Sequence, residues 1–378
     1  QHASYTGRLI NTIGSFKNTI SYNNTYILRN VTGNDKKNYY GYRDAINFIS
    51  EYNFDLDNRI IFGLDNEFDK AELYNYYTAS SYAESDEAIY SQYFDLQLRP
   101  REDTYTTFGL RRDYHTTAED YYTGRATVAY KLDNNTKLRA NLGTSVRFPS
   151  LNSLNHGNSL VVKENLKAET GKSIDIGIDK LFPENNINLS ATTFFLEYKN
   201  DIKGWASHTG GVGGTYALAN SLSKTESYGL ELQTNWKPND NYALGLGYTR
   251  TESYDGTTCD NPDSTAAADG SSCNDEMNVR VPRNQLNLIG TKIFNKNLSQ
   301  TLKFKYVDER RDYGNTNNGF TDVILSNYVV ADLVTNINLF DTYNLNISAK
   351  NILDARYSEA YEYKAPGRSV NLMLKKSY

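Results

Sequence analysis

Apolar and polar residues alternate along most of the chain. In residues 343–350, Tyr343, Leu345 and Ile347 occupy every second position, and Asn or Ser fills the positions between them. Successive side chains of a β-strand point to opposite faces, so this pattern predicts a strand with one apolar and one polar face. The same pattern recurs in segments 138–143, 174–179, 230–236, 242–248 and 302–306. The strands of a soluble β-sandwich also alternate between apolar and polar residues. In this chain, however, one face stays apolar and the other stays polar from strand to strand along the whole sequence.

The connections between these segments alternate in length. Short turn sequences occur at 57–58, 133–135, 184–186, 238–240, 295–297 and 341–342, and long polar stretches occur at 200–214, 256–278 and 312–322. Short turns facing one compartment and long loops facing the other are typical of an up-and-down barrel. We count about seventeen strands, each longer than the roughly 9–11 residues that cross a bilayer. The prediction is an all-β, transmembrane antiparallel barrel, with residues 1–378 forming a single domain.

Composition narrows the class of protein further. Hydrophobic residues make up 39% and mean hydropathy is −0.65, and no window approaches 18 consecutive apolar residues, so membrane-spanning helices are excluded. Thirty-two Tyr and 15 Phe are too many aromatic residues for a disordered chain. A net charge of −5 gives no electrostatic support for nucleic-acid binding. No signal peptide precedes the first strand-like segment, as expected of a mature or truncated chain.

The end of the chain carries a second indication of a barrel. Val370, Leu372, Leu374 and Tyr378 share one face of a final strand that ends on an aromatic residue. Outer-membrane barrels commonly end in this way, although Lys376 interrupts the apolar face. An ordinary amphipathic strand is the alternative interpretation.

Five segments, in order along the chain, resemble the C-terminal part of TonB-dependent outer-membrane receptors. They are 140–152 (ANLGTSVRFPSLN), 165–173 (NLKAETGKS), 227–232 (SYGLEL), 350–357 (KNILDARY) and 361–369 (YEYKAPGRS). In the second segment Ala168 stands where the family usually has Pro. The tyrosine-rich last segment, which leads into Pro-Gly-Arg, is most similar to the cobalamin (vitamin B12) transporter branch.

The resemblance implies a function as well as a fold. It implies a protein of the Gram-negative outer membrane, in contact with lipid, that imports a scarce large nutrient, here cobalamin or a similar chelate. Transport in this family is energised by TonB through an N-terminal plug, and the barrels have 22 strands. Neither the plug nor the first strands are in this sequence, so we expect the C-terminal part of such a barrel. The alternatives are a ferric-siderophore receptor of the same family and a passive porin-like barrel without a plug.

The resemblance and the side-chain chemistry suggest functional positions. The residues of the C-terminal family motif are Tyr361, Pro366, Gly367, Arg368 and Tyr378. Aromatic loop residues anchor binding surfaces, so the candidate ligand contacts are Trp205, Tyr361 and Tyr363, although aromatic residues also form the interfacial girdle of barrels. Arg147 and Arg368 are candidates to face the lumen and the plug. A solvated barrel interior is the simpler interpretation for each arginine.

Catalytic and metal chemistry finds little support. His2, His115, His156 and His208 are scattered, none at zinc spacing, and no nucleotide-binding or nucleophile motif occurs. A pairing of His115 with Asp113 is conceivable, but an ordinary loop is the favoured interpretation. We therefore expect no enzyme, no metal site and no cofactor. The acidic loop 256–278 could bind calcium, although a solvated loop is favoured. Cys259 and Cys273 in this loop are expected to form a disulfide, because the protein would fold in an oxidising envelope.

Overall fold

The computed structural model describes residues 1–31, 37–75, 82–151, 166–207, 216–220, 224–255, 276–316, 319–339 and 342–376. Eighteen strands form one sheet, and seventeen remain when the two-residue β15 (Glu276–Met277) at the end of β14 is set aside. The predicted all-β fold and the predicted strand number are therefore confirmed. The seventeen are β1 (His2–Ile13), β2 (Phe16–Val31), β3 (Lys37–Asn53), β4 (Arg59–Asn75), β5 (Tyr82–Arg101), β6 (Thr104–His115), β7 (Tyr121–Asp133), β8 (Thr136–Arg147), β9 (Glu169–Phe182), β10 (Ile187–Lys199), β13 (Thr225–Asn239), β14 (Tyr242–Asp255), β16 (Asn284–Asn295), β17 (Leu298–Val307), β20 (Tyr328–Leu339), β21 (Tyr343–Lys350) and β24 (Ser369–Lys376).

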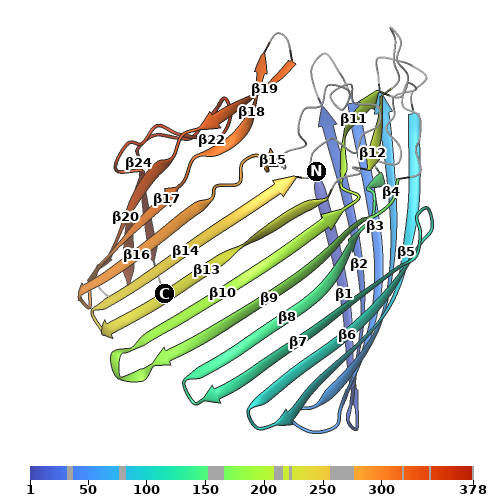
Figure 1. Ribbon diagram of the computed structural model, residues 1–378, viewed down its shortest axis with the longest axis horizontal. Coiled ribbons are helices and arrows are strands. Elements are labelled where there is room, and N and C mark those ends of the chain that lie inside the picture. The colour runs from blue at the N-terminus through green and yellow to red at the C-terminus, as the bar shows by residue number, and fades with distance from the viewer. Residues whose placement is uncertain are drawn as a thin grey trace.

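Each strand of the sheet pairs antiparallel with the next strand of this series. The sheet curls into an open arch with β1 and β24 at its two edges (Figure 1). Within the described ranges no pairing joins these two edges. Because seventeen is odd, β1 and β24 run in the same direction. A barrel closed by antiparallel pairing alone would need an odd number of further strands between them.

The predicted apolar and polar faces are present along the sheet. On the apolar face, large side chains are left exposed, for example Leu9 at 66%, Leu142 at 57% and Leu372 at 70%. A continuous exposed apolar surface of this extent is expected where the solvent is lipid. No helix among the described residues is long and apolar enough to cross a membrane.

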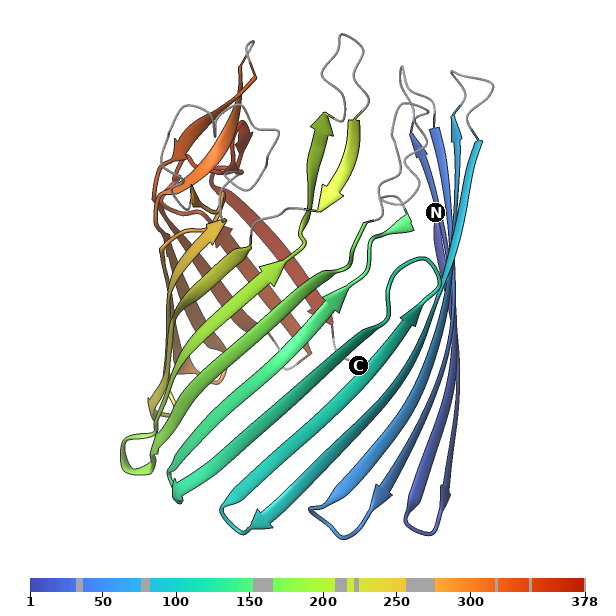
Figure 2. The same ribbon diagram turned by 45° about the vertical axis from the view of Figure 1, so that its right-hand side comes forward.

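The two ends of the sheet differ in their connections, as predicted. Short turns join the strands at the lower end of the sheet, and the longer excursions lie at the upper end (Figure 2). In the turn after β3, the carboxylate of Asp55 accepts the backbone N–H groups of Asp57 and Asn58 at 2.8 Å. Hydrogen bonds from Asn58 and these amides lower the pKa of Asp55. Asp133, Asn239 and Asn295 each accept the N–H two residues ahead in the same way, which fixes the tight turns.

The long polar segments are more ordered than the sequence pattern indicated. The stretch 312–322 falls within a hairpin of β18 (Arg310–Thr316) and β19 (Gly319–Leu325), and the stretch 200–214 includes β11 (Ile202–Ser207), which pairs with β12 (Tyr216–Asn220). Two very short strands, β22 (Ser358–Ala360) and β23 (Tyr363–Lys364), pair near the C-terminus, and a single 3-10 turn, η1 (Pro183–Asn185), joins β9 to β10. These strands lack the alternating pattern because neither of their faces is committed to lipid.

Candidate functional site

Arginine side chains on the polar face reach past the neighbouring strand to the next one. Arg125 of β7 donates from Nε to Asp95 Oδ2 of β5 at 3.0 Å, and Arg139 of β8 donates to Thr192 of β10. Side chains of alternate strands converge only on the concave side of a curved sheet. The polar face is therefore the inner face of the arch.

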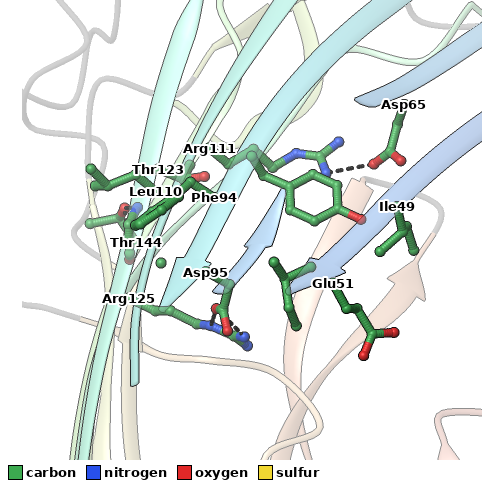
Figure 3. Close-up of a pocket in the computed structure, with 14 residues that line it drawn as sticks. Ile49, Glu51, Asp65, Phe94, Asp95, Leu110, Arg111, Thr123, Arg125 and Thr144 are labelled. Atoms are coloured by element: carbon green, nitrogen blue, oxygen red, sulfur yellow. Dashed lines mark hydrogen bonds and ion pairs between the residues drawn. The ribbon is translucent and has the colours of Figure 1, made fainter. Parts of the chain in front are cut away.

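A pocket of about 520 Å³ lies on this inner face and is lined by side chains from six successive strands, β3 to β8. Figure 3 shows the two ion pairs that border it, Arg111 with Asp65 and Arg125 with Asp95. The guanidinium of Arg111 also lies 5.6 Å from the ring of Tyr93. That ring covers Gly63, where a Cβ would come within 2.0 Å of it. Because every charge at this pocket is paired within the wall, the pocket is polar without carrying a strong net field.

Arg147, a predicted lumen-facing residue, is at the end of β8 on the polar face. Its Nη1 lies 3.0 Å from Glu169 Oε2, directly across the strand pair β8–β9, and its side chain is 78% exposed. Glu169 also accepts the N–H of Ile202 at 2.9 Å, so it joins the wall to the β11–β12 hairpin. Its predicted contact with a plug stays a prediction.

A buried histidine lies at the upper end of the same wall. The side chain of His115 is fully buried, and its Nε2 is 3.2 Å from Glu87 Oε2. Its Nδ1 accepts the N–H groups of Thr117 and Ala118, both at 3.1 Å, so the neutral ring carries its proton on Nε2. The ring of Phe148 stacks on it at 4.4 Å. The sequence favoured an ordinary loop here over a pairing with Asp113, and Asp113 in fact binds Ser91 and Arg111.

A cluster of charged and aromatic residues forms at the upper end of the C-terminal strands. At its centre Asp312 of β18 is fully buried and accepts the Nε of Arg280 at 2.9 Å and the N–H of Tyr361 at 2.6 Å. Burial alone would raise the pKa of Asp312, but the amides of Tyr361 and Tyr313 and the guanidinium of Arg280 together lower it. This carboxylate therefore holds the β18–β19 hairpin and the segment after β21 together.

A second arginine of this cluster has no acidic partner among the described residues. Arg310 is only 5% exposed, donates from Nη2 to the carbonyl of Ser358 at 2.6 Å, and lies 5.4 Å from the ring of Tyr328. Its Nη1 is buried without a hydrogen-bond partner. The ring of Tyr328 stacks on that of Tyr357 at 4.0 Å. The combination is a positively charged group beneath a pair of stacked aromatic rings.

The family-like segment after β21 is held by two side chains. Asn351 has φ 49°, accepts the N–H of Ala355 at 2.9 Å and donates to the carbonyls of Ala355 and Pro366 at 3.0 and 3.2 Å. Asp354 accepts the N–H of Arg368 at 3.0 Å. This hydrogen bond, together with nearby Arg356, lowers the pKa of Asp354. These contacts explain why Asn and Asp stand three residues apart in this segment.

The predicted ligand contacts are separated in the structure. Tyr361 is half-buried against Asp312, and Tyr363 on β23 is 76% exposed. Trp205 lies on β11, and its side chain is outside the described residues. Arg368 precedes β24 with an exposed side chain, next to Gly367 and Pro366. Tyr378, Cys259 and Cys273, with most of the acidic loop, lie outside the described residues, so the disulfide and the calcium site stay predictions.

Sequence reasoning missed Arg280, Arg310 and Asp312. A signal for them existed, since residues 310–313 read Arg-Arg-Asp-Tyr in a segment otherwise expected to be a loop. Within the described ranges no group of three or more His, Cys, Asp or Glu is placed to hold a metal ion.

The fold is shared with solved outer-membrane receptor structures. The siderophore receptor PirA from Acinetobacter baumannii is 16% identical, with a TM-score of 0.76 over 100% of this chain and 62% of that one. The ferripyoverdine receptor of the outer membrane of Pseudomonas aeruginosa is 13% identical, with a TM-score of 0.77 over 99% of this chain and 56% of that one. A mutant of the ferric enterobactin receptor from Pseudomonas aeruginosa is 18% identical, with a TM-score of 0.74 over 100% and 61%.

These similarities have a definite extent. The chain spans about three fifths of the length of the solved structures that it matches. No curated protein sequence matches it. A model of the family described as TonB dependent receptor-like, beta-barrel, matches residues 2–352, which is most of the chain. Barrels of this family are outer-membrane transport receptors of Gram-negative bacteria. The chain belongs to the TonB-dependent receptor β-barrel family.

Proposed function

We propose that the protein is an outer-membrane receptor that takes up a ferric siderophore and is energised by TonB. The observation that carries this proposal is the cluster at the upper end of the C-terminal strands. Arg280 pairs there with Asp312, which also accepts the backbone N–H of Tyr361. Arg310 lies 5.4 Å from the ring of Tyr328, which stacks on that of Tyr357. Ferric siderophores present oxygen-rich, commonly anionic and aromatic surfaces. Arginine and stacked tyrosine rings suit such surfaces through charge-assisted hydrogen bonds and ring stacking.

The names of the similar structures support the same substrate class. The solved relatives include a siderophore receptor, a ferripyoverdine receptor and a ferric enterobactin receptor. Their sequence identity to this chain is low, so they contribute a class of ligand and no individual compound. The function predicted first from the sequence, cobalamin import, draws no support from these names.

Cobalamin remains the second candidate. It is favoured by the tyrosine-rich segment 357–363, followed by Pro366-Gly367-Arg368, which resembles the cobalamin branch. Arg310 disfavours it, because a nearly neutral corrinoid gains little from a buried cation that has no acidic partner. A passive porin-like barrel is the third candidate, and it would require no energy-transducing partner.

The remaining parts of the proposal concern location and partners. The exposed apolar face would contact outer-membrane lipid, and the inner face would enclose a plug that binds TonB. Residues 1–378 would act as one barrel domain. We propose neither enzymatic activity nor a resident cofactor.

A binding measurement on the whole receptor separates the two substrate classes. Purified full-length protein would be titrated with ferric enterobactin and with cyanocobalamin, in the native form and as Arg310→Gln. Arg311→Gln, which removes the adjacent arginine, is the matched control. We expect the native protein to bind the ferric chelate, and Arg310→Gln to weaken binding at least tenfold. Binding of cyanocobalamin alone would replace the siderophore proposal with the second candidate.

A further inference from the structure

The inner face of the sheet divides into two sectors of different chemistry. The first, called here the paired sector, is the inner face of β3–β10. Its arginines are matched with carboxylates of the same wall; the pairs are Arg43–Asp69, Arg111–Asp65, Arg125–Asp95, Arg139–Asp175 and Arg147–Glu169. The second, the amide sector, is the inner face of β13, β14, β16, β17, β20, β21 and β24. Arg250 is the only arginine in these strands. Its side chain lies on the apolar face, because its neighbours Thr249 and Thr251 face inward.

Neutral side chains dominate the amide sector. Asn346 donates to Asn336 and Asn344 donates to Asn338, both at 2.7 Å, and Thr291 and Thr301 share a hydrogen bond of 2.9 Å. Gly247 of β14 belongs to this sector as well, and a Cβ at this position would meet no atom within 4 Å. The wall is therefore lined by groups that exchange hydrogen bonds easily.

Positive charge is also present in the amide sector. Lys303 and Lys305 of β17 flank Phe304, which points to the apolar face, so both lysines point inward. Lys305 is 3.9 Å from the exposed Glu359, whereas the guanidinium groups of the paired sector have carboxylates at 2.5–3.7 Å. Asp332 of β20 is directly opposite Lys303 and also faces inward, so the lysines of this sector stand beside a single carboxylate and not in a row of arginine ion pairs.

Passage of a ligand through a protein requires sites that bind it at each step and release it again. Amides, hydroxyls and separated lysines meet this requirement. The paired sector does not, because its donors are already used within the wall and its ion pairs stiffen it. We propose that an anionic chelate crosses the protein along the amide sector, and that the paired sector is the fixed side of the lumen. The inference rests on the proposed uptake function and adds a route to it.

Obstruction of one wall at a time tests the route. Gly247→Trp places a large ring on the amide sector, and Gly143→Trp of β8 is the matched change on the paired sector, where a Cβ meets Ser173 Oγ at 3.4 Å and the backbone oxygen of Gly124 at 4.0 Å. Full-length variants of equal surface abundance would be assayed for binding and uptake of ferric enterobactin labelled with ⁵⁵Fe. We expect Gly247→Trp to slow uptake at least tenfold with binding changed less than twofold, and Gly143→Trp to change neither. Equal losses, or a loss in Gly143→Trp alone, would overturn the proposal.

A second measurement needs no knowledge of the ligand. In full-length protein with Cys259→Ser and Cys273→Ser, cysteine is introduced at Thr291→Cys on the amide sector or Thr127→Cys on the paired sector. Both threonines are half-buried and face inward, and each lies at or beyond the middle of its strand, toward the short turn after Asn295 or Asp133. A membrane-impermeant maleimide added to cells should label Thr291→Cys at least ten times faster. Equal rates or the reverse order contradict the route. If the native protein takes up no ferric enterobactin, the substrate proposal fails while the labelling still decides the route.

Discussion

Arg111 on β6 reaches past β5 to Asp65 on β4, with its Nη1 2.8 Å from Asp65 Oδ2. The same guanidinium donates from Nε to Asp113 at 2.8 Å, and Asp113 in turn accepts the hydroxyl of Ser91 on β5 at 2.6 Å. Three strands are thus connected through one side chain, in addition to their backbone ladder. Such contacts make the inner wall of β3–β10 a connected unit rather than a row of independent strand pairs.

Removal of this guanidinium should destabilise the wall. Arg111→Gln leaves Asp113, which is only 3% exposed, without its cation, so we expect a loss of about 1–3 kcal/mol in the free energy of unfolding. The measurement is the midpoint of thermal unfolding of the detergent-solubilised full-length protein. Arg8→Gln on the inner face of β1 is the control, because Arg8 has no ion pair among the described residues. Equal shifts in the two variants would show that the network adds nothing.

The turn after β21 gives a separate test of backbone and side-chain effects. Asn351 combines a left-handed backbone, φ 49°, with three side-chain hydrogen bonds to Ala355 and Pro366. Asn351→Gly tolerates the left-handed backbone conformation but loses the side-chain hydrogen bonds. Asn351→Ala loses the hydrogen bonds and also disfavours the left-handed conformation. We expect a destabilisation of about 1–2 kcal/mol for Gly and a further loss of up to about 1 kcal/mol for Ala. Chemical unfolding of the two variants in parallel provides the comparison, and Ala no worse than Gly would refute the backbone contribution.

Asp312 makes the upper cluster sensitive to acid. The pKa of Asp312 is lowered in the folded protein, so its charged form stabilises the fold. This stabilisation is fully present above the ordinary carboxyl pKa, near about pH 4, and is lost as the pH falls through the lower pKa of the folded protein. We expect hydrogen exchange at the amides of Tyr361 and Tyr313 to accelerate below about pH 4, beyond the intrinsic pH dependence. Asp312→Asn should show fast exchange at neutral pH and no further acid transition. An acid transition retained in Asp312→Asn would assign it to another group.

Gly229 of β13 explains the glycine in the SYGLEL segment. A Cβ at this position would lie 2.0 Å from the carbonyl oxygen of Arg250 and 2.8 Å from the ring of Phe194. Gly229→Ala should therefore lower the free energy of unfolding by about 1–3 kcal/mol or more, because the backbone of β14 has to move. Gly247→Ala, on the same face of β14 with open space around it, is the matched control and should be nearly neutral. Yields of heat-modifiable, folded protein in outer-membrane fractions report the difference.

Much of the fold follows from alternation alone, because lipid on one side and water on the other act on every strand in the same way. Leu142, Ile176 and Leu372 are all exposed on the face that the sequence pattern predicted. The short turns also followed from local chemistry, since Asp55 and Asn295 bond their own backbone two or three residues ahead. Pairing order then follows, because consecutive strands joined by tight turns become neighbours.

The candidate site was harder to predict because its residues come from distant segments. Asp312 meets Tyr361 across 49 residues, and Arg310 meets Ser358 across 48. Nothing local in the sequence indicates such contacts, and the β18–β19 hairpin shows no lipid-driven alternation. The position of His115 was hard to predict for the same reason: the sequence favoured an ordinary loop, whereas the histidine is buried at the end of β6 beside Glu87 of the preceding strand, and Asp113 belongs to the arginine network.

The central claim, energised uptake of a ferric siderophore, is tested most directly by transport in cells. Full-length protein would be expressed in a strain without receptors of its own, with TonB present or deleted. Accumulation of ⁵⁵Fe-enterobactin and ⁵⁷Co-cyanocobalamin would then be measured at nanomolar concentrations. We expect TonB-dependent accumulation of iron and no accumulation of cobalt. Accumulation of cobalt alone would contradict the substrate, and accumulation that persists without TonB would contradict the mechanism.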